Sequence, residues 1–194
     1  MAEIIKDGTG SGNTAKVDSE NRLSVKALVL PEDLEAGLLG QAFDISAGLI
    51  TITNDTCNSL LYIKNNECGN LVIDAIFFDS GCSTCGAGAG QITWHLGPTA
   101  GTLISETCCA QVLNRQIGAS CTLTADAYKA AAVSKTLTGG STVSFPSGGG
   151  LFTKPFIIPK GQAFGISYTA PSGNTSQVVQ AGLVILKGVT NGDG

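Results

Sequence analysis

The residues with the most reactive side chains are the seven cysteines of the chain. They stand at Cys57, Cys68, Cys82, Cys85, Cys108, Cys109 and Cys121. Cys82 and Cys85 have the two-residue spacing that lets two thiolates bind one tetrahedral metal ion, and Cys108 with Cys109 would complete four ligands. Adjacent cysteines chelate poorly, so zinc binding is the minor hypothesis. We expect the protein to need neither a metal nor a cofactor.

Disulfide bonds are a second use for these thiols. A bridge between Cys57 and Cys68 would span the turn between two expected strands and would stabilise the fold by about 2–4 kcal/mol. The odd number of cysteines leaves at least one thiol free or available to another subunit. The first residues lack the apolar region of a secretory signal, so we expect synthesis and retention in the cytoplasm, where thiols stay reduced. Bridged and reduced cysteines therefore both stay open.

His95 is the one histidine of the chain. Catalysis by a serine or cysteine nucleophile needs an imidazole within hydrogen-bonding reach. Ile92, Trp94 and Leu96 alternate with polar residues, which is typical of a strand with one face in a core. His95 then points outward, beside no nucleophile motif. Only Asp74 among the acids lies inside a strongly apolar stretch, so no pair of catalytic carboxylates is indicated. The sequence therefore predicts a protein that is not an enzyme.

The composition excludes two classes of partner. Charged residues make up 13% of the chain, the formal net charge is −4, and the 11 basic residues are scattered. Nucleic-acid binding requires clustered lysine and arginine. No apolar run reaches the roughly 18 residues that a membrane span needs. We therefore expect neither a nucleic acid nor a membrane as partner.

The expected elements are mostly short strands. Residues 49–53, 60–64 and 71–79 read as strands separated by turn residues, and the last is apolar on both faces, as in a central buried strand. Residues 31–40 read as a short helix that begins after a proline and ends at a glycine. Residues 124–133 allow a second short helix, with a loop or edge strand as the alternative.

The last third of the chain completes the fold prediction. Residues 152–158 form a strand interrupted by Pro155, which confines it to a sheet edge or a bulge. The alternation in 164–169 and 179–186 predicts two strands paired with each other. About eight or nine short strands indicate an all-β fold, an antiparallel two-sheet sandwich that is jelly-roll-like.

The first 26 residues differ from the rest. They are polar and rich in glycine, and they cannot bury enough apolar surface to offset the entropy of ordering. We interpret residues 1–26 as an extended N-terminal arm that orders on a partner, 27–187 as the β-sandwich body and 188–194 as a flexible tail. The expected contact residues of the arm are polar Lys6, Asp7, Lys16, Asp18 and Arg22 and apolar Ile4, Ile5 and Val17.

The amino-acid sequence of this arm resembles that of a known class of proteins. Residues 5–26 begin Ile5-Lys6-Asp7-Gly8-Thr9-Gly10-Ser11-Gly12-Asn13-Thr14-Ala15-Lys16-Val17-Asp18 and continue with Asn21-Arg22-Leu23. They resemble the N-terminal segment of structural proteins of tailed-bacteriophage virions, most of all capsid decoration (cement) proteins. Residues 152–162 and the strands after them are similar to the closing strands of jelly-roll virion modules.

The resemblance implies a virion protein on the outer surface of the head, commonly a homotrimer, that stabilises contacts between major capsid subunits. Its partners would be the major capsid protein and copies of itself. The family offers no catalytic residues, and the cysteines match no pattern in it. The alternative is a head-fibre or tail-associated receptor-binding module, which would present its loops to a host-surface glycan or protein receptor.

Overall fold

The computed structural model describes residues 4–6, 14–16, 32–53, 56–84, 90–102, 110–130, 136–146, 150–152, 156–173 and 176–188. By its contacts the chain divides into two units, Met1–Pro31 and Glu32–Gly194. The boundary follows Pro31, compared with the predicted end of the arm at residue 26.

The N-terminal unit contains two short strands, β1 (Ile4–Lys6) and β2 (Thr14–Lys16). They pair in antiparallel fashion, with Ile4 opposite Lys16 and Lys6 opposite Thr14. Over these two stretches the backbone is paired in a ladder. For the rest of residues 1–26 the extended arm stays a prediction.

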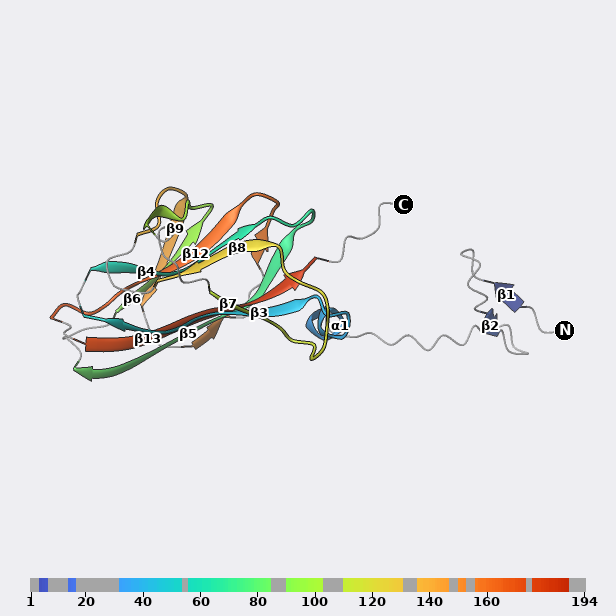
Figure 1. Ribbon diagram of the computed structural model, residues 1–194, viewed down its shortest axis with the longest axis horizontal. Coiled ribbons are helices and arrows are strands. Elements are labelled where there is room, and N and C mark those ends of the chain that lie inside the picture. The colour runs from blue at the N-terminus through green and yellow to red at the C-terminus, as the bar shows by residue number, and fades with distance from the viewer. Residues whose placement is uncertain are drawn as a thin grey trace. The chain divides into compact units, whose positions relative to one another are not determined.

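The larger unit is built from two antiparallel sheets that form two layers, with one short helix, α1 (Glu32–Leu38), at one end (Figure 1). One sheet has six strands: β3 (Ala42–Ile52), β5 (Leu71–Thr84), β7 (Gln111–Asn114), β10 (Gly150–Phe152), β11 (Phe156–Ile158) and β13 (Ser176–Lys187). The other has five: β4 (Cys57–Asn65), β6 (Gln91–Leu96), β8 (Ala125–Lys129), β9 (Ser141–Pro146) and β12 (Ala163–Thr169). The predicted antiparallel β-sandwich is confirmed.

The strand order places the long strands in the middle of each sheet. The six-stranded sheet runs β10-β5-β13-β3-β7, and β11 pairs with β5 on the same edge as β10. The five-stranded sheet runs β8-β4-β12-β6-β9. The stretch 152–158 was predicted to lie at an edge, and both β10 and β11 do so. The prediction of a central, buried strand over 71–79 is also confirmed, since β5 lies between β13 and these edge strands.

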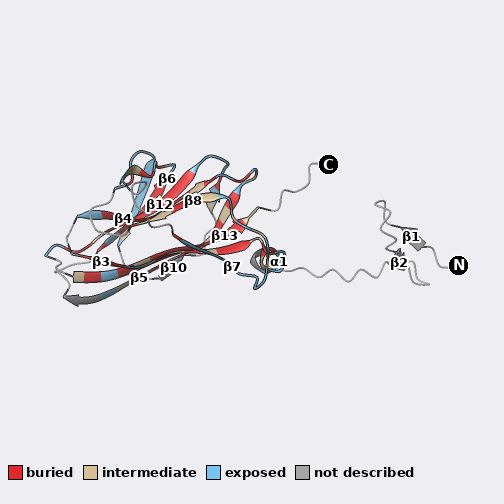
Figure 2. Cartoon of the chain, viewed as in Figure 1, coloured by how far each residue is buried: buried red, intermediate tan, exposed pale blue. Residues whose placement is uncertain are grey.

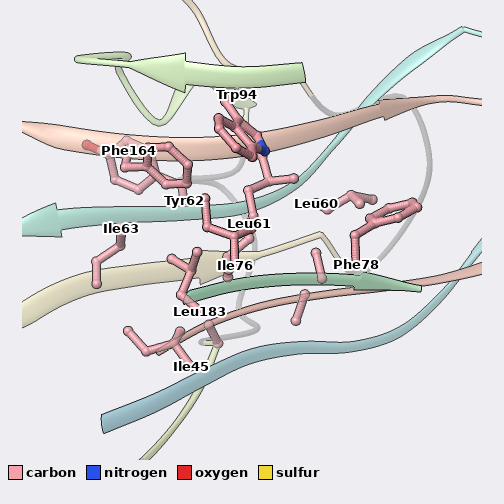
Figure 3. Packing of buried hydrophobic residues seen from close by; sticks show 14 of the residues in the cluster. Ile45, Leu60, Leu61, Tyr62, Ile63, Ile76, Phe78, Trp94, Phe164 and Leu183 are labelled. Carbon is pink, nitrogen blue, oxygen red and sulfur yellow. The ribbon is translucent and has the colours of Figure 1, made fainter. Parts of the chain in front are cut away.

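The two sheets face each other across an apolar core (Figures 2 and 3). Along β13, Leu183 and Ile185 point inward and are fully buried, because successive side chains of a strand alternate between its faces. Trp94 of β6 packs against rings from both sheets. Its ring centroid lies 5.1 Å from that of Phe152 and 5.3 Å from that of Phe156 in the opposite sheet.

A polar network closes one end of this core. The Asn65 side-chain amide donates to the carbonyl of Ile158 at 2.8 Å. Glu67 accepts a hydrogen bond from the Thr124 amide at 2.6 Å and forms an ion pair with Lys187 at 2.9 Å. Desolvation acts to raise the pKa of Glu67, but these hydrogen bonds and the lysine charge outweigh it and lower that pKa. The network ties the ends of β4, β11 and β13 to the loop that holds Glu67 and to the segment before β8.

The predicted helix over 31–40 is confirmed as α1. Gly40 has a φ of 68°, which a residue with a side chain rarely adopts. The Gly40 amide donates to the Gly37 carbonyl at 3.1 Å, and the Gln41 amide donates to the Ala36 carbonyl at 2.7 Å. These two bonds are the Schellman pattern that ends a helix.

Residues 125–129 form strand β8 at a sheet edge, which was the alternative to a helix, because pairing with β4 and the stacking of Tyr128 on Tyr62 override the helix preference of the alanines. The expected pairing of two later strands was wrong. The strands over 164–169 and 179–186 do not pair, since β12 and β13 lie in different sheets. Leu96 lies on the same side of β6 as Trp94, as expected, but it is 38% exposed because the strand ends there.

The core packing predicts a sharp contrast between two leucines. Leu183 is fully buried between the sheets, whereas Leu49 on the outer side of the same sheet is 76% exposed. Leu183→Ala should lower the free energy of unfolding by about 2–5 kcal/mol, because it leaves a cavity. Leu49→Ala should change it by less than about 0.5 kcal/mol. Urea unfolding measures both values, and equal losses would contradict this core assignment.

Candidate functional site

The outer face of the six-stranded sheet is partly covered by α1. Ala36 of the helix packs against Ala42, Ala75, Val184 and Leu186 of three neighbouring strands. Two of these contacts are alanines, so the helix can approach the sheet closely. The covered side chains are all buried, which makes this half of the outer face a second, smaller core.

The rest of the same face, which is its far half together with the edge strand β11 beside the covered half, has no cover among the described residues. It carries exposed apolar side chains from four strands, which we call the apolar outer face: Leu49, Leu151, Ile157 and Val178. Their exposed fractions are 76%, 63%, 64% and 37%. The register places them on the outer side, since Ile157 lies opposite Val72 and Leu49 lies opposite Gln180. Apolar side chains that gather on one exposed face are typical of a protein interface.

Phe77 joins this surface to the strand beside it. It lies opposite both Leu151 and Gly182, and a side chain at Gly182 would collide with the Phe77 ring. The glycine therefore lets the ring lie flat on β13. Within the described part of this face, charged residues are few: Asp79 is exposed, and Asp44 pairs with Arg115 at 3.5 Å. Low charge favours burial against another protein, because few ions need desolvation.

A hollow of about 360 Å³ lies next to α1. Leu34 and Leu38 line it together with Arg115 and Gln116. The two leucines are 47% and 59% exposed. The Gln116 side chain donates to the carbonyl of Leu38 at 3.1 Å and fixes the loop against the helix. The two leucines lie four residues apart on one face of the helix, and that face is open.

The prediction that His95 is exposed was wrong. It is 8% exposed and its Nε2 atom lies 2.8 Å from the hydroxyl of Ser167. Ser167 lies 3.0 Å from the hydroxyl of Ser59, which accepts a hydrogen bond from the Leu137 amide at 2.8 Å. His95 does lie on the outer side of its sheet, but residues 136–138 cover that side. Leu137 packs directly on Gly165, where a side chain would collide with it.

This histidine and its two serines hold structure together. Both serine hydroxyls are buried, with exposed fractions of 1% and 0%, so no substrate can reach them. Each of these groups has a hydrogen-bond partner in one arrangement. In it, the Leu137 amide donates to the Ser59 hydroxyl, Ser59 donates to Ser167, and Ser167 donates to the unprotonated Nε2 atom of His95. Burial lowers the pKa of His95, which favours this neutral form.

Of the two alternatives left open for Cys57 and Cys68, the structure has the reduced thiols and not the disulfide. Both thiols are free and exposed, as Cys121 is free. Cys57 begins β4 and Cys68 lies in the turn beyond its end, and the nine residues of this strand span about 26 Å at 3.3 Å per step. A disulfide requires α-carbons within about 7 Å of each other.

The structure describes only one of the four proposed zinc ligands. Cys82 lies in β5, with its backbone opposite Gln177, whereas Cys85, Cys108 and Cys109 lie outside the described residues. Among the residues that the structure describes, no group of three or more histidine, cysteine or acidic side chains is placed to hold a metal ion. In the same residues, no helix has the length and apolar character that a membrane crossing requires.

The predicted contact residues of the arm are described only in part. Ile4, Ile5, Lys6 and Lys16 lie in the paired strands β1 and β2. Asp7, Val17, Asp18 and Arg22 lie outside the described residues. The apolar outer face was not identified from the sequence, although the alternation in residues 176–187 already places Val178 opposite to the core side chains.

Comparisons with known proteins leave the family open. No protein-family model matches the chain, and no curated protein matches its sequence.

The buried His95 predicts a pH dependence of stability. The unfolded chain takes up a proton near pH 6.5, whereas the folded protein resists protonation because its imidazole pKa is lower. The free energy of unfolding therefore keeps its full value above that pH. It falls as the pH drops from 7 to 5, by at most about 1.4 kcal/mol per pH unit.

The substitution His95→Gln should make the free energy of unfolding depend less on pH between 7 and 5, since the chain has no other histidine. Urea unfolding at a series of pH values measures both proteins, and carboxylate titration affects both alike. Parallel curves between pH 7 and 5 would show that the imidazole is not held neutral.

Proposed function

We propose that this chain is a non-enzymatic structural subunit of a tailed-bacteriophage virion, a decoration (cement) protein on the outer surface of the head. The observation that carries the proposal is the order of the strands. The chain crosses between the sheets so that β10/β11-β5-β13-β3 faces β9-β6-β12-β4. This order supports an eight-stranded jelly roll with β7 and β8 added at the edges, a fold that recurs in viral capsid domains.

The proposed contact with the shell is the apolar outer face. Four strands contribute to it and few charges lie on it, as at the centre of protein interfaces. Residues 1–26, whose sequence resembles phage virion proteins, supply the second contact. The subunit stabilises the head mechanically, by burying surface across the joints between major capsid subunits. Its own copies assemble as a homotrimer in this proposal.

The role of the apolar outer face can be tested with introduced charges. Leu49→Asp and Leu151→Asp should each weaken binding to undecorated heads by tenfold or more, because a buried carboxylate would have no partner. Thr142→Asp adds the same charge at an exposed position of the other sheet and should bind normally. Cosedimentation with purified heads measures binding.

Native mass spectrometry of the same variants distinguishes two uses of the face. Leu49→Asp should keep the native oligomer while it loses binding to heads. A change of oligomeric state with unchanged binding would show that the face joins copies of the chain, and would contradict contact with the shell.

The contribution of the arm is tested by truncation. Deleting residues 1–20 removes most of the segment that resembles phage proteins and leaves the sandwich, which has its own core. We expect the truncated protein to melt at the same temperature and to bind heads at least tenfold more weakly. Unchanged binding would contradict the role of the arm.

A second candidate is a head-fibre or tail-associated receptor-binding module. It is favoured by a hollow lined by two tyrosines and several polar side chains on the outer side of the five-stranded sheet.

A further inference from the structure

The five-stranded sheet carries a hollow of about 390 Å³ on its outer side. Residues 97–100 and the turn at 161–162 form two of its walls, and strands β4 and β8 form its floor. We call this hollow the tyrosine groove. Its polar and aromatic lining comes from Tyr62, Lys64, Thr99, Asp126, Tyr128 and Gln162.

The pairing of β4 with β8 fixes the floor of the tyrosine groove. Tyr62 lies opposite Tyr128, and Lys64 lies opposite Asp126. The two rings stack with their centroids 5.9 Å apart and an angle of 20° between their planes. Tyr62 is 5% exposed and supports Tyr128, which is more open. Stacked rings held by two paired strands form a rigid surface that loses little entropy when a ligand binds.

The wall opposite these strands is also held in place. The Thr99 amide donates to the Thr138 carbonyl at 2.7 Å, and Leu137 beside it is anchored to the sheet through Ser59. The Gln162 amide donates to the carbonyl of Pro159 at 3.0 Å in the turn before β12. The groove is therefore formed before any ligand arrives, as small-molecule sites usually are.

The charges in the tyrosine groove select the kind of ligand. Lys64 and Asp126 are neighbours of opposite sign, so the floor has no net charge. A phosphate would meet one lysine beside a carboxylate, and a divalent cation would meet one carboxylate beside a lysine. Burial, with the charge of Asp126 and the neighbouring Tyr128, raises the pKa of Tyr62 and keeps its hydroxyl protonated. These groups suit a neutral ligand that both donates and accepts hydrogen bonds.

A sugar ring has this chemistry together with an apolar face. Its C–H groups can lie on an aromatic ring, and its hydroxyls can bond to a carboxylate, an ammonium, an amide and a phenol at once. The hollow is within the size range of small-molecule sites. We propose that the tyrosine groove binds a neutral hexose unit of a glycan. This activity lies on the sheet opposite the proposed shell contact, and it does not depend on whether the subunit sits on the head or the tail.

The test is a titration of the ¹⁵N-labelled full chain, followed by amide chemical shifts in buffer with EDTA. The probes are the methyl glycosides of glucose, galactose, mannose and N-acetylglucosamine, and inorganic phosphate serves as the charged comparison. At least one sugar should shift the amides of Asp126, Tyr128 and Gln162 with a dissociation constant of about 1–10 mM, as expected for a single sugar unit.

Matched variants locate the binding. Gln162→Ala and Asp126→Asn should weaken the sugar by fivefold or more, whereas Gln91→Ala, at an exposed position of the same sheet outside the groove, should not. Tyr128→Ala should abolish binding, and its amide spectrum reports whether the fold is intact. The proposal is overturned if none of the four sugars shifts these amides, if phosphate alone does so, or if Gln91→Ala weakens the sugar as much as Gln162→Ala.

Discussion

The sandwich depends on the burial of two apolar faces that neither sheet could bury alone. Leu183 and Ile185 of β13 meet side chains of β4 and β12 across the core, and Trp94 brings together rings from both layers. Burying one large apolar side chain contributes about 1.5–3 kcal/mol, so this shared core outweighs every polar contact described above. Because the inner faces of the two sheets pack against each other, only the outer faces and the edges can bind a partner or a ligand.

The two outer faces are used in opposite ways. On the six-stranded sheet, α1 covers one half and leaves the apolar outer face open. On the five-stranded sheet, residues 136–138 cover His95 and Ser167, and the tyrosine groove lies beside them. One face therefore suits a large partner of low charge and the other a small polar ligand. This division would let a single subunit attach to a particle and present a binding site away from it.

The sequence predicted what is local and failed where distant segments meet. Alternation over 164–169 correctly predicted a strand, and Phe164, Ile166 and Tyr168 are its inward residues, because the two faces of a strand follow from its own geometry. It could not predict that β12 and β13 join different sheets. His95 was correctly assigned to the outer side but not to the interior, because the covering segment lies far away in the sequence.

The candidate sites follow the same rule. Leu49 and Val178 can be assigned to an outer face from alternation, but whether a helix covers them depends on where α1 packs. The stacking of Tyr62 on Tyr128 requires that residues 125–129 form a strand, and the alanines in this stretch favoured a helix. The proposed role of residues 1–26 rests on a resemblance and not on described contacts.

The most direct test of the proposed role is electron cryomicroscopy, at side-chain resolution, of intact particles that contain this chain. The account predicts the sandwich on the outer surface of the head, with the apolar outer face against the shell and the tyrosine groove toward solvent. Density for this protein at the tail alone, or with the tyrosine groove buried against the shell, would contradict it.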